Sequence, residues 1–256
     1  MDNKERILAN RKFMHCPKFA EVMSQSDQQK GIKHPAHGHP ITGERIVLPF
    51  SESAISEASY PRLLDIRRSE RKYKDEAITQ EQLAFLLWSA QGIQQYRGDA
   101  NQSTLRPAPS GGARHPFELY FVVRKVVGLK PGLYRYAPVE NVGEKIVTVE
   151  YKGAFENHEE RISSCLANQV WASTASVVLF FTSVAYRAEW RYVEASHRVV
   201  LIDLGHAGQN VMLSASALGL GSCCIAAYNQ QLCDEALSVN GVDEYTVYII
   251  PVGIVN

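Results

Sequence analysis

The densest group of charged side chains in the sequence is residues 67–73, RRSERKY, which holds three arginines, one lysine and one serine. Arg67 and Arg71 share a face whether the segment is helical or extended, whereas Ser69 joins them only in an extended chain. Two guanidinium groups with a hydroxyl between them suit a phosphate, which offers several charged oxygens at short range. The alternative is a solvated basic surface whose charges pair with neighbouring acids. Those acids are Asp65, Glu70, Asp75 and Glu76.

A second candidate segment is the loop that begins at Pro107, PAPSGGARHP. In it, Ser110, Gly111 and Gly112 stand between prolines, shortly before the apolar, β-rich run of residues 117–123. Glycine lets the backbone approach a ligand closely, and consecutive main-chain N–H groups in such a turn can form a concavity that binds anions. A tight turn that leads into a core strand explains the same residues, so the loop alone leaves both interpretations open.

Histidines and cysteines give little support to a metal site. His34, His37 and His39 lie within six residues, but the prolines and glycines around them favour an extended connector without a complete ligand set. The five cysteines contain no C-x-x-C pair and are odd in number, which argues against both a zinc site and a disulfide framework. Cys223 and Cys224 are expected to be small apolar fillers. We expect no metal, and a reducing cytoplasm as the compartment.

Composition limits the class of protein. The chain has 256 residues, of which 45% are hydrophobic, and the basic and acidic residues number 27 each. One domain with additions and a sizeable core is the expected organisation. Zero net charge argues against a broad nucleic-acid-binding surface, so any anion site is local. The N-terminus is charged from residue 2, and no apolar run approaches the roughly 20 residues of a membrane span, so neither export nor a membrane is expected.

The elements that would position these residues can be predicted from periodicity. A T-x-x-Q capping box at residues 79–82 precedes apolar residues at the spacing of one buried helical face, which predicts a helix that ends near Gly92. The continuously apolar run at residues 176–184 predicts a central strand that is buried on both faces. Residues 133–137 and 145–151, bracketed by turns, predict a strand pair that is attached as a local addition to the fold.

The second half of the chain contains the longest helical candidate, at about residues 192–218. Apolar residues on nearly every side predict burial all round. Its small residues would also allow another helix to approach closely, so a subunit interface is an alternative to a monomer core. Gly219 supplies the stop, and a short buried strand at residues 222–227, a helix capped by Asn229 and a last strand at residues 245–250 follow. The irregular mixture of strands and helices favours an α+β fold.

Four stretches in this order resemble a known family: RRSERKY, PSGGARHPFELYFVV, DLGHAGQNVMLSASALGLGSC and VYIIPVG. Together they are similar to the FMN-dependent nitroreductase family, and within it to the branch that contains the SagB-type azoline dehydrogenases. The resemblance covers most of residues 65–253. It implies a nitroreductase-like α+β fold, with a central mixed sheet packed by helices and a long buried helix, in a homodimer with FMN at the interface. Residues 1–50 would be an N-terminal extension and connector, and residues 51–256 the FMN-binding domain.

The resemblance also implies roles for particular residues. The basic segment would bind the FMN phosphate. The glycine loop, with its serine and its glycine amides, would meet the flavin from the partner subunit. A third segment would lie beside the isoalloxazine ring, where a backbone N–H could hydrogen-bond flavin N5. In that order, the three groups are Arg67, Arg68, Ser69 and Arg71; Pro109, Ser110, Gly111 and Gly112; and Ile225, Ala226 and Ala227.

The activity that the resemblance implies is ping-pong hydride transfer from NADH or NADPH, through FMN, to a nitroaromatic, a quinone or a similar small acceptor. The alternatives are an azoline dehydrogenase of peptide tailoring and a flavin-binding module without turnover. Azoline dehydrogenases use a Lys-Tyr pair in proton removal, and the corresponding place here reads Trp190-Arg191-Tyr192. Arg191 stays protonated and cannot readily act as a base, whereas Tyr192 keeps a phenol that could orient a substrate. These two residues are the catalytic candidates.

Overall fold

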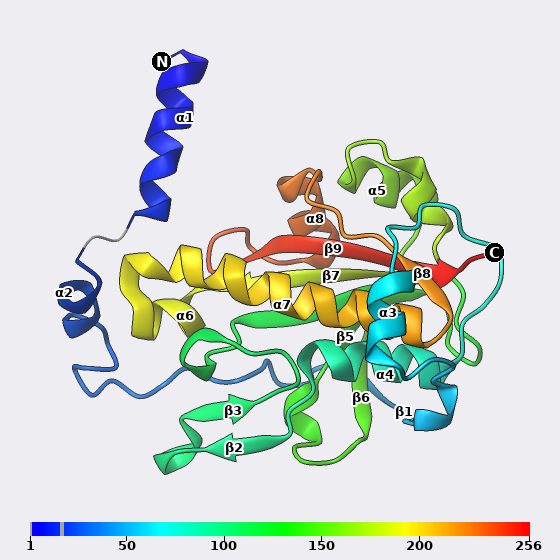
Figure 1. The fold of residues 1–256 in the computed structure, drawn as a ribbon, viewed down its shortest axis with the longest axis horizontal. Coiled ribbons are helices and arrows are strands. Elements are labelled where there is room, and N and C mark those ends of the chain that lie inside the picture. Colours follow the sequence, from blue (N-terminus) through cyan, green and yellow to red (C-terminus); the bar gives the residue numbers. More distant parts are fainter. Residues whose placement is uncertain (1, 16–17) are drawn as a thin grey trace.

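The computed structural model describes residues 2–15 and 18–256, and its centre is a seven-stranded sheet (Figure 1). The strand order is β1-β6-β5-β4-β7-β9-β8, and β2 and β3 form a separate hairpin. The strands are β1 (Glu44–Leu48), β2 (Gln95–Arg97), β3 (Ser103–Leu105), β4 (Phe117–Val123), β5 (Gly132–Tyr136), β6 (Val147–Gly153), β7 (Val177–Val184), β8 (Leu220–Ser222) and β9 (Glu244–Ile254). The α-helices are α1 (Asn3–Arg11), α2 (Phe19–Ser24), α3 (Tyr60–Ile66), α4 (Gln80–Gln91), α5 (His158–Cys165), α6 (Ala185–Tyr192), α7 (Ser196–Ala217) and α8 (Gln230–Leu237).

The sheet is the middle of three layers. Because successive side chains of a strand point to opposite faces, β4 contributes to two cores. Leu119 and Phe121 pack in one hydrophobic cluster with α4 and α7, whereas Tyr120 and Val122 pack in a second cluster with α5 and α8. β7 lies between β4 and β9 and is buried on both faces in the same way, so the predicted central strand at residues 176–184 is confirmed.

Local signals explain where several elements begin. At the start of α4, Gln82 N donates to Thr79 Oγ1 at 3.2 Å, and Thr79 N donates to Gln82 Oε1 at 2.9 Å, so the predicted capping box is confirmed. The helix ends at Gln91, just before Gly92. Leu232 N donates to Asn229 Oδ1 at 3.1 Å, which confirms the predicted cap of α8.

The sheet corrects three of the sequence predictions. All pairings between the named strands are antiparallel, so the sheet is not mixed. The reason lies partly in the connections, because β4, β5 and β6 follow one another through turns too short for a parallel crossover. β5 and β6 are also no local addition, since they link β4 to β1 within the sheet. The strand predicted at residues 222–227 is instead β8, which ends at Ser222, because the continuous pairing with β9 covers only residues 220–222 and Ile225 adds a single isolated bridge to Ile249.

The long helix differs from its prediction in two respects. Residues 192–218 contain a break, because α6 ends at Tyr192, Val193 has a φ of 48°, and α7 begins at Ser196. In addition, Leu201 and Ile202 of α7 are 51% and 55% exposed. The prediction of burial on all sides is therefore wrong within one chain, since the sheet covers only one side of a helix that lies across it (Figure 1).

The N-terminal segment joins the fold only in part. α1 stands away from the body in Figure 1, and none of its residues is buried. β1, by contrast, pairs with β6, with Ile46 opposite Val149. The division of the chain at residue 50 stays a prediction, and Cys16 and Pro17 lie outside the described residues. Of the helices in the described part of the chain, none is both long enough and apolar enough to cross a bilayer.

Candidate functional site

The basic segment follows α3 and leaves the helical conformation at Arg67. Ser69 forms a parallel bridge with Ser222, and Glu70 N donates to the carbonyl of Ser222 at 2.9 Å. Arg68 Nη1 donates to the carbonyl of Arg67 at 2.8 Å. The bridge gives Ser69 the extended conformation in which its side chain can join those of the two outer arginines. It also places the basic segment beside the end of β8, where the ring-side segment, residues 225–227, is about to begin.

Two of the four neighbouring acids pair with residues outside the basic segment. Asp65 accepts from Arg62 at 2.8 Å, and Asp75 accepts from Arg124 at 2.6 Å. Within residues 2–15 and 18–256, no carboxylate forms an ion pair with an arginine of residues 67–71. The interpretation as a basic surface paired with its neighbouring acids therefore fails for these arginines. The segment keeps its positive charge, which is the electrostatic requirement for a local anion site.

Two of the arginines point toward different neighbours. The guanidinium group of Arg71 lies over the ring of Trp171, 5.8 Å from its centroid. Arg67 lies close enough to Cys224 to act on its thiol. Burial raises the pKa of this thiol, and the charge of Arg67 is one of the groups that oppose the rise. Arg67 and Arg71 thus contact different neighbours, and Arg67 acts on the residue directly before the ring-side segment.

The ring-side segment turns from buried to exposed. Ile225 is buried, and its N–H donates to the carbonyl of Ile249 at 2.8 Å. Ala226 and Ala227 are exposed, and the carbonyl of Ala227 accepts from Gln169 Nε2 at 3.0 Å. In the described part of the chain, no acceptor is present for the main-chain N–H groups of the two alanines. Two exposed donors next to a patch of uncompensated positive charge are suited to a ligand that carries both an anionic group and acceptor atoms.

The glycine loop is held by a buried acid of α7. Ser110 Oγ donates to Asp203 Oδ2 at 2.6 Å, and Gly111 N donates to Asp203 Oδ1 at 3.0 Å. His115 N donates in turn to Ser110 Oγ at 2.9 Å. Burial raises the pKa of the Asp203 carboxyl, although the hydrogen bonds from Ser110 and Gly111 oppose the rise. Two donors that were expected to meet FMN are therefore already engaged within the chain.

The catalytic candidates lie directly behind this loop. Gly112 has a φ of 56°, and a methyl group added to it would lie 2.5 Å from Arg191 Cδ and 2.8 Å from Tyr192 Oη. Glycine is required here by both the backbone conformation and the close approach. Tyr192 is buried, and Arg191 Nη1 donates to Gln28 Oε1 at 2.6 Å. The loop, Arg191 and Tyr192 therefore form one packed unit at the start of α7.

A mainly apolar hollow opens on the other side of the loop. Its volume is about 270 Å³, and it adjoins the exposed side of α7. The residues that line it are Pro109, Ser110, Gly111, Val199, Ile202, Asp203 and His206.

The predicted site residues form two separate sets within one chain: the glycine loop with Arg191 and Tyr192, and the basic segment with the ring-side segment. The loop is hydrogen-bonded to α7 at Asp203, in the first half of the helix. The chain just before α3 reaches the other end, where Ser56 N donates to the carbonyl of Ala217 at 2.8 Å. These two anchor points are 14 residues apart on α7, or about 21 Å at 1.5 Å per residue. In the described residues, no hydrogen bond joins the loop to the basic or ring-side segments.

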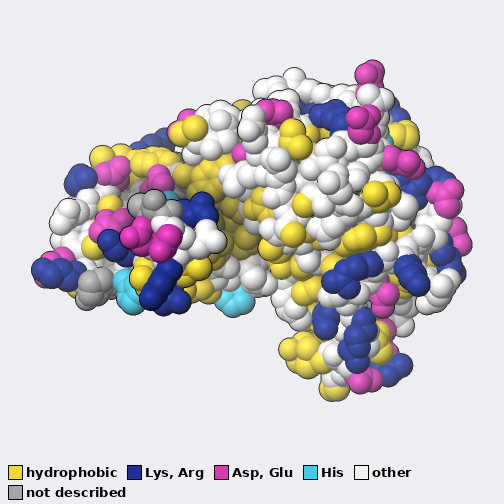
Figure 2. All heavy atoms as spheres, turned by 90° about the horizontal axis from the view of Figure 1, so that it is seen from above, with side chains coloured by type: hydrophobic (Ala, Val, Ile, Leu, Met, Phe, Trp, Pro, Cys, Tyr) yellow, Lys and Arg dark blue, Asp and Glu magenta, His cyan; other side chains and the backbone are white. Residues whose placement is uncertain are grey.

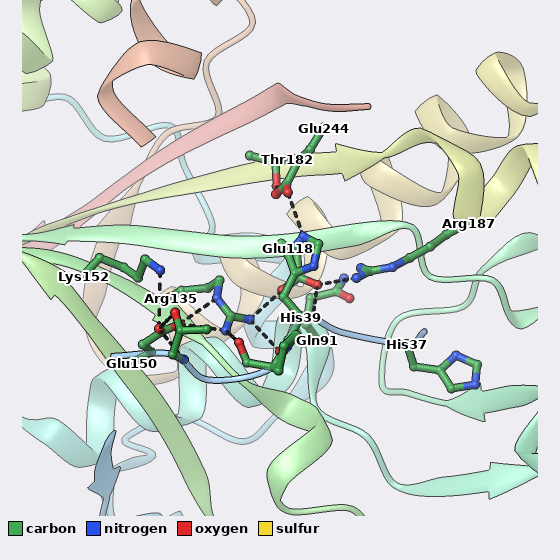
Figure 3. Close-up of polar contacts among 12 residues, drawn as sticks. His37, His39, Gln91, Glu118, Arg135, Glu150, Lys152, Thr182, Arg187 and Glu244 are labelled. Atoms are coloured by element: carbon green, nitrogen blue, oxygen red, sulfur yellow. Dashed lines mark hydrogen bonds and ion pairs between the residues drawn. The ribbon is translucent and has the colours of Figure 1, made fainter. Parts of the chain in front are cut away.

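A second polar cluster is formed by side chains of β4, β5 and β6 (Figure 3). Arg135 is 2% exposed and pairs with Glu118 at 3.1 Å and with Glu150 at 2.7 Å. Glu118 also accepts from Arg187 Nη2 at 2.6 Å. Burial would raise the pKa of Glu150, but hydrogen bonds from the Thr42 backbone and from Arg135 lower it to about 2. Burial also opposes ionisation of Glu118, but the charges of Arg187 and other neighbours outweigh it and lower the pKa.

This cluster also fixes the histidine-rich connector to the sheet. His39 N donates to Glu118 Oε1 at 2.9 Å, and the His39 ring contacts Glu244 Oε2 at 2.7 Å. Arg135 donates to the carbonyls of His39 and Pro40. Across residues 2–15 and 18–256, no group of three or more His, Cys, Asp or Glu side chains is placed to hold a metal ion. The contacts of His39 are those of a structural tether.

Asp203 is the main site residue that the sequence reasoning missed. It lies between apolar residues in a segment that was predicted to be buried on every side, and it is 4% exposed. A carboxylate buried in such a helix requires hydrogen-bond donors. That requirement could have pointed to Asp203 as a residue that binds donors of another segment, and Ser110 beside the glycine amides offers a suitable set of donors.

A family model and three known proteins are similar to this chain. A model of the nitroreductase family matches residues 64–254. "Putative nitroreductase MJ1384" of Methanocaldococcus jannaschii is 31% identical over 199 residues, which are 78% of this chain and 92% of that protein. The trifolitoxin-processing protein TfxB of Rhizobium leguminosarum bv. trifolii is 34% identical over 118 residues, which are 45% of this chain and 30% of that protein. The crystal structure of a "putative nitroreductase" from Anabaena variabilis has a TM-score of 0.60 at 26% identity, over 76% of this chain and 38% of that chain.

Proposed function

This chain belongs to the nitroreductase family, and on that premise we propose that it is an FMN-dependent enzyme that passes hydride from NADH or NADPH to a small acceptor, such as a nitroaromatic or a quinone. The family makes it an oxidoreductase. The observation that carries the proposal is the uncompensated positive charge of residues 67–71 beside the exposed N–H groups of Ala226 and Ala227. FMN has a phosphate for the first and ring acceptors for the second.

The residues fit the cofactor in charge and in hydrogen bonding. Arg67 and Arg71 would bind the phosphate, with the hydroxyl of Ser69 between them. The N–H of Ala226 or Ala227 would donate to the flavin ring. FMN, when bound, supplies the hydride chemistry, and the protein supplies position, charge and exclusion of water. Arg191 and Tyr192 would act through Gly112, because both lie against it and hold the loop in shape.

We further propose a homodimer with the cofactor between the subunits. Each chain carries two partial sets of site residues along α7, and the exposed side of this helix is apolar at Leu201 and Ile202. Figure 2 shows hydrophobic side chains gathered on one face, between the two ends of the elongated molecule. A two-fold axis beside α7 would bring the loop of one protomer to the basic segment of its partner. The hollow beside the loop would then become an enclosed site.

Anaerobic mixing of the FMN-loaded protein with a nicotinamide tests the activity. We expect NADH or NADPH to bleach the visible absorbance of the bound flavin, and a quinone or a nitroaromatic to restore it. A ping-pong cycle also predicts parallel lines in double-reciprocal plots of the steady-state rate. Flavin that binds but stays oxidised with both nicotinamides would contradict the oxidoreductase assignment for these donors and favour a binding module.

The phosphate assignment predicts that changing Arg67 and Arg71 together to alanine weakens FMN binding by at least about 100-fold. The reason is that each charged hydrogen bond contributes roughly 1.5–3 kcal/mol. Fluorescence titration of free FMN measures the affinity. Riboflavin, which lacks the phosphate, should bind both proteins equally. Arg62→Ala is the matched control, since Arg62 is an arginine of α3 that already pairs with Asp65. Unchanged FMN affinity in the double variant would overturn the assignment.

A second candidate function is dehydrogenation of azoline rings in a peptide. The match to a trifolitoxin-processing protein favours it, although that match covers 45% of this chain. Tyr192 would then orient the ring through its phenol, which lies at Gly111 and Gly112. An azoline-containing peptide that bleaches bound flavin in the absence of nicotinamide would support this function. Failure of the peptide, together with rapid bleaching by NADH or NADPH, would exclude it.

A further inference from the structure

Two cysteine side chains from different helices meet on the face of the sheet that is opposite α7. Cys165 is the last residue of α5, and Cys233 lies in α8. Their exposed fractions are 2% and 0%. Cys233 Sγ is 3.7 Å from the carbonyl oxygen of Cys165, which places the two cysteines side by side. Neither is bonded to another cysteine.

A surface cavity adjoins one of these two cysteines. It lies between α5 and α8, has a volume of about 320 Å³, and has Cys165 in its lining. Arg161 lines the same cavity. The interaction with Cys233 lowers the pKa of the Cys165 thiol; the charge of Arg161 acts in the same direction, and burial and the charge of Glu235 oppose it. Cys233 does not line the cavity, so the two thiols differ in accessibility. The remaining lining residues are Asn157, Glu160, Ser164, Leu232, Glu235 and Ala236.

We propose that Cys165 and Cys233 form a reversible dithiol–disulfide site that a hydroperoxide oxidises. The Cys165 thiolate attacks one oxygen of the peroxide, the O–O bond breaks, and a sulfenic acid forms while the peroxide leaves as an alcohol or water after it takes a proton. The Cys233 sulfur then attacks the Cys165 sulfur, and water leaves. Overall, two thiols lose two electrons and two protons, and one hydroperoxide is reduced to one alcohol and one water.

The geometry assigns distinct roles to the two residues. Cys165 reacts first because it lines the cavity, and Cys233 resolves the sulfenic acid because it is already its neighbour. A disulfide would bring the two sulfurs to about 2.05 Å. The bond would join α5 to the helix that directly follows residues 225–229. Asn229 N already donates to the carbonyl of Cys165 at 2.7 Å, so the end of α5 and the start of α8 are already in contact.

The test uses the full chain with Cys16, Cys223 and Cys224 changed to serine, so that only the pair remains. After treatment with hydrogen peroxide, free thiols are blocked with N-ethylmaleimide and the intact mass is measured. We expect loss of both adducts, a disulfide-linked peptide that contains Cys165 and Cys233, and full recovery with dithiothreitol. Peptide mapping of the wild-type chain gives the same readout if the triple variant does not fold.

Single variants separate the two roles. In Cys233→Ser, dimedone should trap a sulfenic acid at Cys165, whereas in Cys165→Ser the oxidation of Cys233 should be at least about tenfold slower, since that thiol lacks access. The proposal is overturned if both thiols stay alkylatable after peroxide treatment. It is also overturned if Cys165 is over-oxidised while Cys233 remains free. Neither readout depends on flavin or on turnover.

Discussion

Changing Glu118 to glutamine is expected to lower the free energy of unfolding by about 3–5 kcal/mol. Glu118 is 2% exposed and lies between two arginines, Arg135 and Arg187. Glutamine keeps the size of the side chain but removes its charge, so both guanidinium groups remain buried without their common partner. In the described residues, Arg187 Nη1 already has no hydrogen-bond partner. Urea unfolding followed by circular dichroism measures the change.

The control for this variant is an exposed ion pair. Asp65→Asn removes the partner of Arg62 on α3, where both side chains are more than half exposed, and should change stability by no more than about 1 kcal/mol. Changing Arg187 to methionine in the Glu118→Gln background should restore part of the loss, because it removes one of the unpaired charges. Equal stability of the two single variants would show that the cluster does not hold the sheet and connector together.

Acid titration gives a second measure of the same cluster. The pKa values of Glu118 and Glu150 are lowered in the folded chain, that of Glu150 to about 2. Below about pH 4.3, the unfolded chain therefore binds more protons than the native chain. The stabilisation is complete above that pH and is lost as the pH falls through the folded pKa values. Wild-type stability should decline between about pH 4.5 and pH 2, and more steeply than that of Glu118→Gln.

The parts of the fold that could be predicted from sequence are those fixed by neighbours along the chain. The capping box at Thr79, the cap at Asn229 and the glycine stop at Gly219 each act within one turn. The apolar run of β7 needed no partner to be recognised, because burial on both faces leaves no alternation. The sequence showed only that Ser69 would join Arg67 and Arg71 if the basic segment were extended. Its extended form depends on the bridge between Ser69 and Ser222, which are far apart in the chain.

The parts that could not be predicted depend on contacts between distant segments. His39 and Glu118 are 79 residues apart, and Ser110 and Asp203 are 93 apart. Charged residues within apolar strands, such as Arg135 opposite Glu150, indicate a buried pair but do not identify which strands are adjacent. The exposure of Leu201 was missed for the same reason. Periodicity shows that a side of a helix is apolar, but not whether the same chain covers it.

If the proposed homodimer holds FMN between its subunits, changing Leu201 and Ile202 together to lysine is expected to convert it into monomers and to remove FMN binding. Each side chain is about half exposed in the single chain, and two-fold symmetry in the proposed dimer would place four of them in the interface. Full burial of such a side chain contributes about 1.5–3 kcal/mol, and four lysines would also repel one another across the axis. Sedimentation equilibrium and FMN titration of the same samples measure the two effects.

The matched control is Val242→Lys, which adds a lysine at a 74% exposed valine between α8 and β9. This variant should change neither the molar mass measured by sedimentation equilibrium nor the affinity for FMN. The two measurements on the α7 variant also separate the dimer from the shared site. A monomer that still binds FMN with wild-type affinity would show that the basic and ring-side segments suffice within one chain, and that the loop contributes nothing across an axis. A wild-type chain that is monomeric in solution and still binds FMN would refute the two-chain site, because one chain would then be enough to bind the cofactor.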